Sequence, residues 1–379
     1  MTSDGTTVQL EEYLGRMLAL GASDLFLRAG IPPSYRVNGQ VLRQDGAPPS
    51  ASVMAQYVQR VLTPMAAERF ARTSDVDVAY AVPGMGRFRI NLFRHQGNLG
   101  LVARLIPEGA IEFSSLGLPA AILAMAHARS GLVLVVGPTG CGKSTTLAAL
   151  IHHINCTRHA HIVTIEDPIE FVHQERLALV HQRQVGSDTA SFASALRHVL
   201  RQSPDVILIG EMRDRETVET ALAAALTGHL VLSTLHTTNI VQSVDRMLNL
   251  FPPEAHRQVQ ADLAVSLAGM VSMRLLARAD GAGRAAATEI LCATPTVRRI
   301  LAEGKLAELY DVMKHGKDTG MMTLNQSLVR LCREGVVTPD EALVYTTNPD
   351  EFKLNMDGMF TGIDSIDQRT EAKAKEQKA

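Results

Sequence analysis

The chain has 379 residues, of which 46% are apolar and 20% charged, a composition typical of a soluble globular protein with a sizeable core. This length exceeds what one compact domain usually needs, so we expect two domains. Lys and Arg number 37 and Asp and Glu number 39, and this near-neutral balance argues against a protein that binds nucleic acid through its overall field. No uninterrupted apolar run approaches the roughly 20 residues that span a bilayer, so we expect no direct membrane insertion.

The four cysteines, Cys141, Cys156, Cys292 and Cys332, lie far apart and form no CxxC pair. This spacing argues against a cysteine zinc site and favours a reducing, cytoplasmic compartment. The N-terminus lacks the basic-then-apolar layout of a secretion signal.

Residues 1–107 read as a small α+β domain. An amphipathic helix near residue 10 is followed by a short strand, a hairpin with its turn at Asn38-Gly39, and a helical stretch near 52–72. The segment "GRFRINLF" alternates with period two, so Arg87 and Arg89 share one face of a strand. Side-by-side arginines suit an anionic partner, and the plainer alternative is a solvated strand face. The next strand carries Arg104.

Residues 108–120 contain Pro, Gly and Ser with little periodicity, and we expect an interdomain linker there. From 121 to 355 apolar strands first alternate with helices, a pattern typical of a parallel sheet covered by helices. From about 255 the chain reads as mostly helical. The polar residues 356–379 are expected to form a disordered tail.

The stretch "VLVVGPTGCGKSTTL" is a P-loop in its required context, between an apolar strand and a helix. Glycines let successive backbone N–H groups surround phosphate oxygens, Lys143 supplies a positive charge, and Ser144 offers a hydroxyl to Mg²⁺. The predicted nucleotide-binding residues are Gly137, Pro138, Thr139, Gly140, Cys141, Gly142, Lys143, Ser144 and Thr145.

Two further strand ends carry carboxylates. "DVILIGE" ends in Glu211, and "VTIEDP" carries Glu166 and Asp167. The ends of parallel strands meet at one edge of a sheet, so both should lie beside the P-loop. Glu211 could orient an attacking water or hold a Mg²⁺-bound water, and Glu166 suits Mg²⁺ through water.

Four stretches together, "GPTGCGKSTT", "TIEDPIEFVH", "RQSPDVILIGEMRD" and "TGHLVLSTLHTTN", resemble the Walker A, Asp-box, Walker B and His-box motifs of secretion-type hexameric ATPases. More narrowly, the chain is similar to the type IV pilus retraction ATPases of PilT or PilU type. The resemblance implies a RecA-like P-loop ATPase core of α/β class, preceded by a PAS-like α+β domain and followed by a helical subdomain.

The resemblance also implies a homohexamer that uses ATP and Mg²⁺ to retract the pilus. Glu211 carries over as the catalytic carboxylate, Glu166 as a Mg²⁺ or water ligand, and Arg89 and Arg104 as arginine fingers. The implied partners are an inner-membrane pilus platform protein and a paralogous pilus ATPase. The implied location is cytoplasmic and peripheral to the inner membrane.

Three positions depart from the family pattern, because Phe26, Gln184 and Leu226 stand where the family commonly has His, Glu and Glu. These changes make an accessory PilU-like paralogue the main alternative to the principal motor. A nucleotide-binding regulator with little turnover is a second alternative, but its mark would be loss of Lys143 or Glu211, and both are present. A nucleic-acid translocase is a third, disfavoured by the neutral charge and the few aromatic residues.

His229 and His236 bracket an apolar strand. Their odd separation of seven residues sends the side chains to opposite faces of an unbroken strand, and without further ligands at suitable spacing a metal site is disfavoured. We expect His236 to lie near Glu211 and the γ-phosphate. We expect His229 to link neighbouring secondary structure or a subunit interface, with a buried structural role as the alternative.

Overall fold

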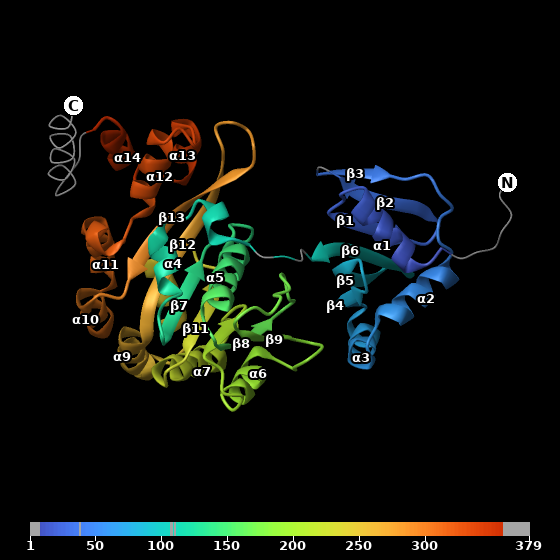
Figure 1. The fold of residues 1–379 in the computed structure, drawn as a ribbon, viewed down its shortest axis with the longest axis horizontal. Coiled ribbons are helices and arrows are strands. Elements are labelled where there is room, and N and C mark those ends of the chain that lie inside the picture. The colour runs from blue at the N-terminus through green and yellow to red at the C-terminus, as the bar shows by residue number, and fades with distance from the viewer. Residues whose placement is uncertain (1–7, 38, 107–108, 110, 359–379) are drawn as a thin grey trace. The chain divides into compact units, whose positions relative to one another are not determined.

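The computed structural model describes residues 8–37, 39–106, 109 and 111–358. These residues form two compact units (Figure 1). The first contains the described residues of 1–109 together with 165–174 and 182–195, and the second contains 111–164, 175–181 and 196–358. No helix among the described residues is both long enough and apolar enough to cross a membrane.

The first unit is built on a six-stranded sheet with the order β3-β2-β1-β6-β5-β4. Phe88, Ile90 and Leu92 of β5 are fully buried under three helices, as the period-two pattern predicts. The strands are β1 (Asp24–Arg28), β2 (Ile31–Val37), β3 (Gln40–Arg43), β4 (Asp75–Val82), β5 (Gly86–His95) and β6 (Asn98–Ile106), and the helices are α1 (Leu10–Ala19), α2 (Ala51–Val61) and α3 (Pro64–Thr73).

Two details of this unit qualify the sequence predictions. The expected helical stretch near 52–72 is two helices, because Pro64 cannot continue α2 and instead begins α3 behind the N-cap Thr63. The hairpin between β2 and β3 pairs Val37 with Gln40, and its turn residue Asn38 lies outside the described residues.

The expected linker 108–120 and tail 356–379 fall partly outside the described residues, which omit 107–108, 110 and 359–379. Within the linker, Phe113–Leu116 form a 3₁₀ turn, and Phe113 is buried in the core of the second unit. Of the tail, the structure describes only the residues up to 358. The domain boundaries at 107, 120 and 355 remain a proposal.

The second sheet of the protein has seven strands in the order β13-β12-β7-β11-β10-β8-β9. Its strands are β7 (Gly131–Val136), β8 (His161–Glu166), β9 (Leu179–Gln184), β10 (Val206–Ile209), β11 (Leu230–Leu235), β12 (Leu267–Ala277) and β13 (Arg284–Cys292). Strands β10, β11, β7 and β12 run parallel, and β13 pairs antiparallel with β12. The mixed α/β class expected from the sequence is confirmed.

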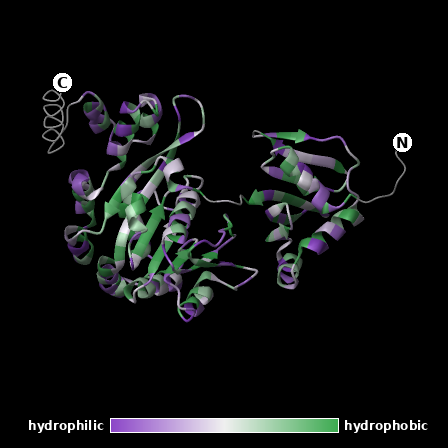
Figure 2. Cartoon of the chain, in the orientation of Figure 1, coloured by the Kyte–Doolittle hydropathy of each residue, from purple (hydrophilic) through white to green (hydrophobic). Residues whose placement is uncertain are grey.

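Helices cover both faces of the central strands. Alternate residues of β7 and β11, such as Val133 and Leu232, pack with α4 and α5 in one core, while α7 contacts the same two strands. Figure 2 shows hydrophobic residues along the strands and hydrophilic residues on the outer surfaces of the helices. The helices are α4 (Ala120–Met125), α5 (Lys143–Thr157), α6 (Phe192–Val199), α7 (Arg215–Leu226), α8 (Ile240–Leu248), α9 (His256–Ser266), α10 (Pro295–Glu303), α11 (Leu309–His315), α12 (Leu324–Arg333), α13 (Pro339–Tyr345) and α14 (Pro349–Met356).

The region after 255 is mostly helical, as the sequence predicts, but it also contains two strands that the sequence analysis did not identify. It contains the strands β12 and β13 as well as helices, and β12 pairs with β7 inside the sheet. The run "LAGMVSMRLLA" is almost wholly buried, and such an apolar run does not distinguish a buried strand from a helix by periodicity alone.

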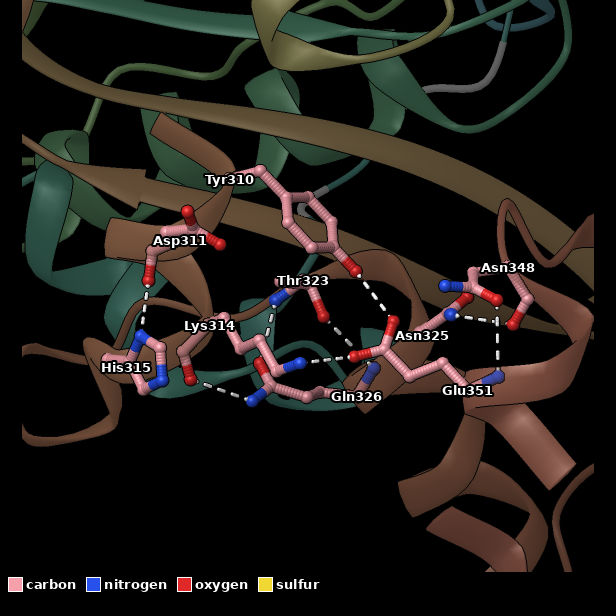
Figure 3. Close-up of polar contacts among 9 residues, drawn as sticks. All are labelled: Tyr310, Asp311, Lys314, His315, Thr323, Asn325, Gln326, Asn348 and Glu351. Carbon is pink, nitrogen blue, oxygen red and sulfur yellow. Dashed lines mark hydrogen bonds and ion pairs between the residues drawn. The ribbon is translucent and has the colours of Figure 1, made fainter. Parts of the chain in front are cut away.

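The C-terminal helices are joined by a partly buried ion pair (Figure 3). Lys314 of α11 donates to Glu351 of α14 at 2.6 Å, and Tyr310 donates to the other carboxylate oxygen at 3.0 Å. Burial acts to raise the pKa of Glu351, but the hydrogen bonds from Lys314 and Tyr310 and the Lys314 charge outweigh it, so the pKa lies below its ordinary value of 4.5. The ion pair between Lys314 and Glu351 therefore links α14 to α11.

We expect Glu351→Gln to lower the free energy of unfolding by about 1–3 kcal/mol, because Lys314 loses its charged partner. A carboxyl whose folded-state pKa is lowered contributes stability above its unfolded pKa, and this is lost as pH falls through the folded value. Thermal unfolding of wild type and variant from pH 7 to pH 3 should therefore converge at acidic pH. The matched control is Glu303→Gln at the exposed Glu303–Lys305 pair; an equal loss in both variants would contradict the prediction.

Candidate active site

Parallel pairing brings two functional loops to one edge of the sheet. In the register of β7 with β11, Val136 stands opposite Leu235, so the two strands end level with each other. The P-loop follows β7, and His236 follows β11. The amide of Gly137 donates to the carbonyl of Leu235 at 3.3 Å, which ties the two loops together at their start.

The P-loop has the backbone conformation of a phosphate cradle. Gly137, Gly140 and Gly142 have φ of 146°, 78° and 97°, values that favour glycine. A Cβ atom at Gly137 would lie 2.7 Å from the carbonyl oxygen of Met273, so no larger residue fits there. The side chain of Lys143 is buried, and its ammonium donates to the carbonyls of Gly137 and Pro138 at 2.8 and 3.0 Å.

Cys141 lies beneath the loop rather than on its surface. It is 4% exposed, and a Cβ at Gly137 would meet its Sγ at 2.5 Å. Burial raises the pKa of the Cys141 thiol, and the nearby charge of Lys143 only partly opposes this effect. The residue therefore packs the loop from below as a protonated thiol.

His236 lies between the P-loop and Glu211. Its Nδ1 is 3.5 Å from both Thr139 Oγ1 and Lys143 Nζ, and its Nε2 is 3.5 Å from a carboxylate oxygen of Glu211. The loop that carries Glu211 is fastened to β11, since Met212 N donates to the carbonyl of Thr234 at 3.2 Å. One imidazole thus spans the predicted phosphate site and the predicted catalytic carboxylate.

Arg213 is a further member of this group that the sequence reasoning did not single out. Its Nε lies 2.7 Å from Glu211, whose side chain is 17% exposed. The signal was present in "GEMRD", where a cation follows the carboxylate by two residues. Arg213 and Glu211 therefore form an ion pair at the edge of the sheet.

His229 directly precedes β11 at the opposite end of this strand, and its side chain contacts the end of α7. Its Nδ1 lies 3.0 Å from the carbonyl of Ala224 and 3.3 Å from Thr227 Oγ1, at the end of α7. The imidazole links the start of the strand to the preceding helix. The two histidines therefore have separate surroundings, and their roles in hydrolysis stay predictions.

Glu166 ends β8, which lies next to β10 in the sheet. It is 9% exposed, and its two oxygens accept hydrogen bonds from Gln182 Nε2 at 3.2 Å and from the amide of Glu170 at 3.4 Å. These bonds orient the carboxylate. Its predicted role at a Mg²⁺ ion is untested.

The metal prediction can be compared with the donor groups present. In the part of the chain that the structure describes, no three His, Cys, Asp or Glu side chains gather as a metal site. Mg²⁺ seldom needs such a cage, because it keeps several waters and binds one or two protein oxygens together with substrate phosphates. Ser144, the second residue of α5, and the P-loop ahead of it fit that mode.

The arginines of the first unit are neutralised by acids of the same sheet. Arg89 stands directly opposite Arg104 in the β5–β6 register. Arg104 donates to Asp24 at 2.8 Å, and Arg89 donates to Asp77 at 3.3 Å. Asp24 is 2% exposed and also pairs with Arg36 at 3.1 Å. Burial acts to raise the pKa of Asp24, but the hydrogen bonds from Ser23 and Arg104 and the arginine charges outweigh it, so the pKa is lowered.

One pocket of about 320 Å³ is lined by Asp24, Asp77, Arg89 and Arg104 together with Asn91 and Val102. The solvated-face alternative stays open, because the side chains of Arg89 and Arg104 are 41% and 65% exposed while they pair with carboxylates. Whether Arg89 and Arg104 act on a nucleotide stays a prediction.

The comparisons with known proteins agree with this geometry. The family model described as "Type II/IV secretion system protein" matches residues 7–343. The chain belongs to this family. It is 41% identical over 345 residues to the type IV pilus retraction ATPase PilT of Pseudomonas aeruginosa, covering 91% of this chain and 100% of that protein. It is 40% identical over 347 residues to the type IV pilus ATPase PilU of the same organism, covering 92% and 91%.

A solved relative supports the same conclusion for the fold. The crystal structure of the pilus retraction motor PilT with bound ADP superimposes with a TM-score of 0.84 and 40% identity, covering 91% of this chain and 98% of that chain. The resemblance inferred from the four motifs is confirmed. Membership of this family supports an ATPase activity, and the individual roles of the P-loop residues, Glu211 and His236 stay predictions.

The two histidines provide a direct test of the site. We expect His236→Ala to reduce ATP turnover by about 10- to 100-fold, since it removes the group between Lys143 and Glu211. We expect His229→Ala to leave turnover near wild type while lowering stability by about 1 kcal/mol, because it loses hydrogen bonds at a helix end. Steady-state ATPase assays and thermal unfolding of both variants measure these effects. Equal losses of turnover would contradict the assignment of different roles to His236 and His229.

Proposed function

We propose that this protein is an ATPase motor that drives type IV pilus retraction. The observation that carries the proposal is the position of His236, which contacts Thr139 and Lys143 of the P-loop on one side and Glu211 on the other. The similarity to PilT over nearly the whole chain supports the choice of substrate and task. The working unit is a homohexamer that engages an inner-membrane platform protein from the cytoplasmic side.

Each residue of the site has a proposed part in hydrolysis. Bound Mg²⁺–ATP would supply the phosphoryl group and a cation that offsets the charge on its oxygens. Lys143 and the P-loop amides hold the phosphates, and Ser144 offers its hydroxyl to the cation. Glu211 orients water and receives its proton, while Arg213 and His236 fix the direction of the Glu211 carboxylate.

Glu166 and the arginines complete the proposal. The hydrogen-bonded Glu166 would hold a water of the magnesium shell. Arg89 and Arg104 would reach the phosphates in the assembled ring and neutralise charge that develops in the transition state. Movement of the domains during this cycle would convert hydrolysis into work on the pilus.

A second candidate is an accessory motor that assists a paralogous pilus ATPase. The observation that favours it is the near-equal identity to PilU, 40% against 41% for PilT. Deleting the gene and measuring twitching motility separates the two. Complete loss of twitching indicates the principal motor, and partial loss that a paralogue restores indicates the assistant.

The hydrolytic proposal predicts that Glu211→Ala lowers ATP turnover by about 10²–10⁴-fold, because the water loses its general base. The matched control is Glu219→Ala, an exposed carboxylate on α7 paired with Arg215, which should retain wild-type turnover. Phosphate release by the purified protein measures both. If the wild type were no faster than the Glu211 variant, the motor function would be rejected.

The finger proposal predicts that Arg104→Ala lowers turnover by about 10³–10⁵-fold with little change in ADP affinity. Arg36→Ala is the matched control, because Arg36 pairs with the same buried Asp24. Should both variants lose turnover equally, Arg104 would serve only to neutralise Asp24.

A further inference from the structure

The loop that carries His236 is held by side chains from β12 and β13. The carbonyl of Thr238 accepts hydrogen bonds from Ser272 Oγ at 3.2 Å and from the guanidinium of Arg274. Two residues further on, the amide of Ile240 donates to a carboxylate oxygen of Glu289 at 3.0 Å. All three hydrogen bonds are made to the backbone, so they fix the path of the chain independently of the side chains of the loop.

Glu289 supplies a hydrogen-bond acceptor for a backbone amide at the start of α8. The first backbone amides of a helix have no partner within it, and the N-cap Asn239 satisfies only that of Gln242, at 2.8 Å. Ile240 is fully buried, so water cannot serve its amide. Glu289 accepts this bond through a carboxyl oxygen.

The supporting side chains are themselves fixed in the sheet. Ser272 and Glu289 stand directly opposite each other in the β12–β13 register and are 4% and 6% exposed. A buried carboxylate is costly unless it is well bonded. Burial raises the pKa of Glu289, and the hydrogen bond from the Ile240 amide and the charge of Arg274 only partly oppose this effect.

The two neighbours of Glu289 in β13 are bound by α12 and by the segment that leads into it. Thr288 N donates to Ser327 Oγ at 3.0 Å, and Ile290 N donates to the carbonyl of Met322 at 2.8 Å. Helix α12 is in turn bound to the start of α14, since Asn325 Nδ2 donates to the carbonyl of Asn348 at 3.1 Å (Figure 3). Glu289 therefore lies where the His236 loop and the C-terminal helices meet one strand.

We propose that Glu289, together with Ser272 and Arg274, is a positioning residue for His236. This inference rests on the proposed ATPase function. None of the three side chains needs to touch substrate. They act by fixing the backbone from Thr238 to Ile240, and through it the direction in which His236 points towards Lys143 and Glu211.

The test compares three variants of the full-length chain. Glu289→Ala removes the acceptor, Glu289→Gln keeps a carbonyl oxygen that can accept the Ile240 amide, and Ser327→Ala breaks the contact of β13 with α12 but not with the loop. We expect Glu289→Ala to lower kcat by about 10- to 100-fold with little change in KM, because the P-loop is untouched. Glu289→Gln should recover most of the activity, and Ser327→Ala should stay near wild type.

Hydrogen–deuterium exchange gives a readout that does not depend on turnover. In Glu289→Ala the amides of residues 236–243 should exchange faster than in wild type, while in Glu289→Gln and Ser327→Ala they should exchange at wild-type rates. If Glu289→Ala does not fold, Arg274→Met and Ser272→Ala take its place, with the same expectation for kcat and for exchange.

The two proposals fail differently. Wild-type kcat and wild-type exchange in the loop of Glu289→Ala, or of its replacements, would overturn the positioning role and leave the ATPase function intact. Loss of kcat equal in Glu289→Ala and Ser327→Ala would also overturn it, because the effect would then be one of general stability. A wild-type protein no faster than Glu211→Ala would reject the ATPase function, and the exchange of residues 236–243 would still decide whether Glu289 holds the loop.

Discussion

The level ending of β7 and β11 is the constraint on which the candidate site depends. Parallel hydrogen bonding pairs Val136 with Leu235, so the loops that follow start side by side. Lys143 can then reach the carbonyls of Gly137 and Pro138 while remaining 3.5 Å from His236. A shift of one residue in this register would turn the following side chains towards the opposite face and separate the lysine from the imidazole.

Sequence reasoning located the parts of the site that strand ends determine. Gly137, Lys143, Glu211 and His236 each follow an apolar run, and the topology of a parallel sheet gathers such residues at one edge. It did not locate Arg213, whose contact with Glu211 depends on how a short loop folds back. Nor could it identify Glu289, because a carboxylate within an apolar strand gives no local indication of the helix amide that it serves.

For the fold as well, local sequence patterns predicted some elements, and contacts between distant residues determined others. Alternation identified β5 because one face of this strand is buried and the other is polar. The strands β12 and β13 were missed because β12 is covered on both faces and has no alternation to read. The pairing of Arg104 with Asp24 was hidden for another reason, since the partners lie 80 positions apart and only the register of β1 with β6 brings them together.

The position of Cys141 has a practical consequence for chemical labelling. A protonated thiol packed under the P-loop is a weak nucleophile, and any adduct on it would have to displace the loop backbone. Among the four cysteines, Cys156 on α5 is the exposed one, and it lies on the same helix that Lys143 begins. A fluorophore attached with a mild thiol reagent would therefore report on the far end of this helix without entering the nucleotide cradle.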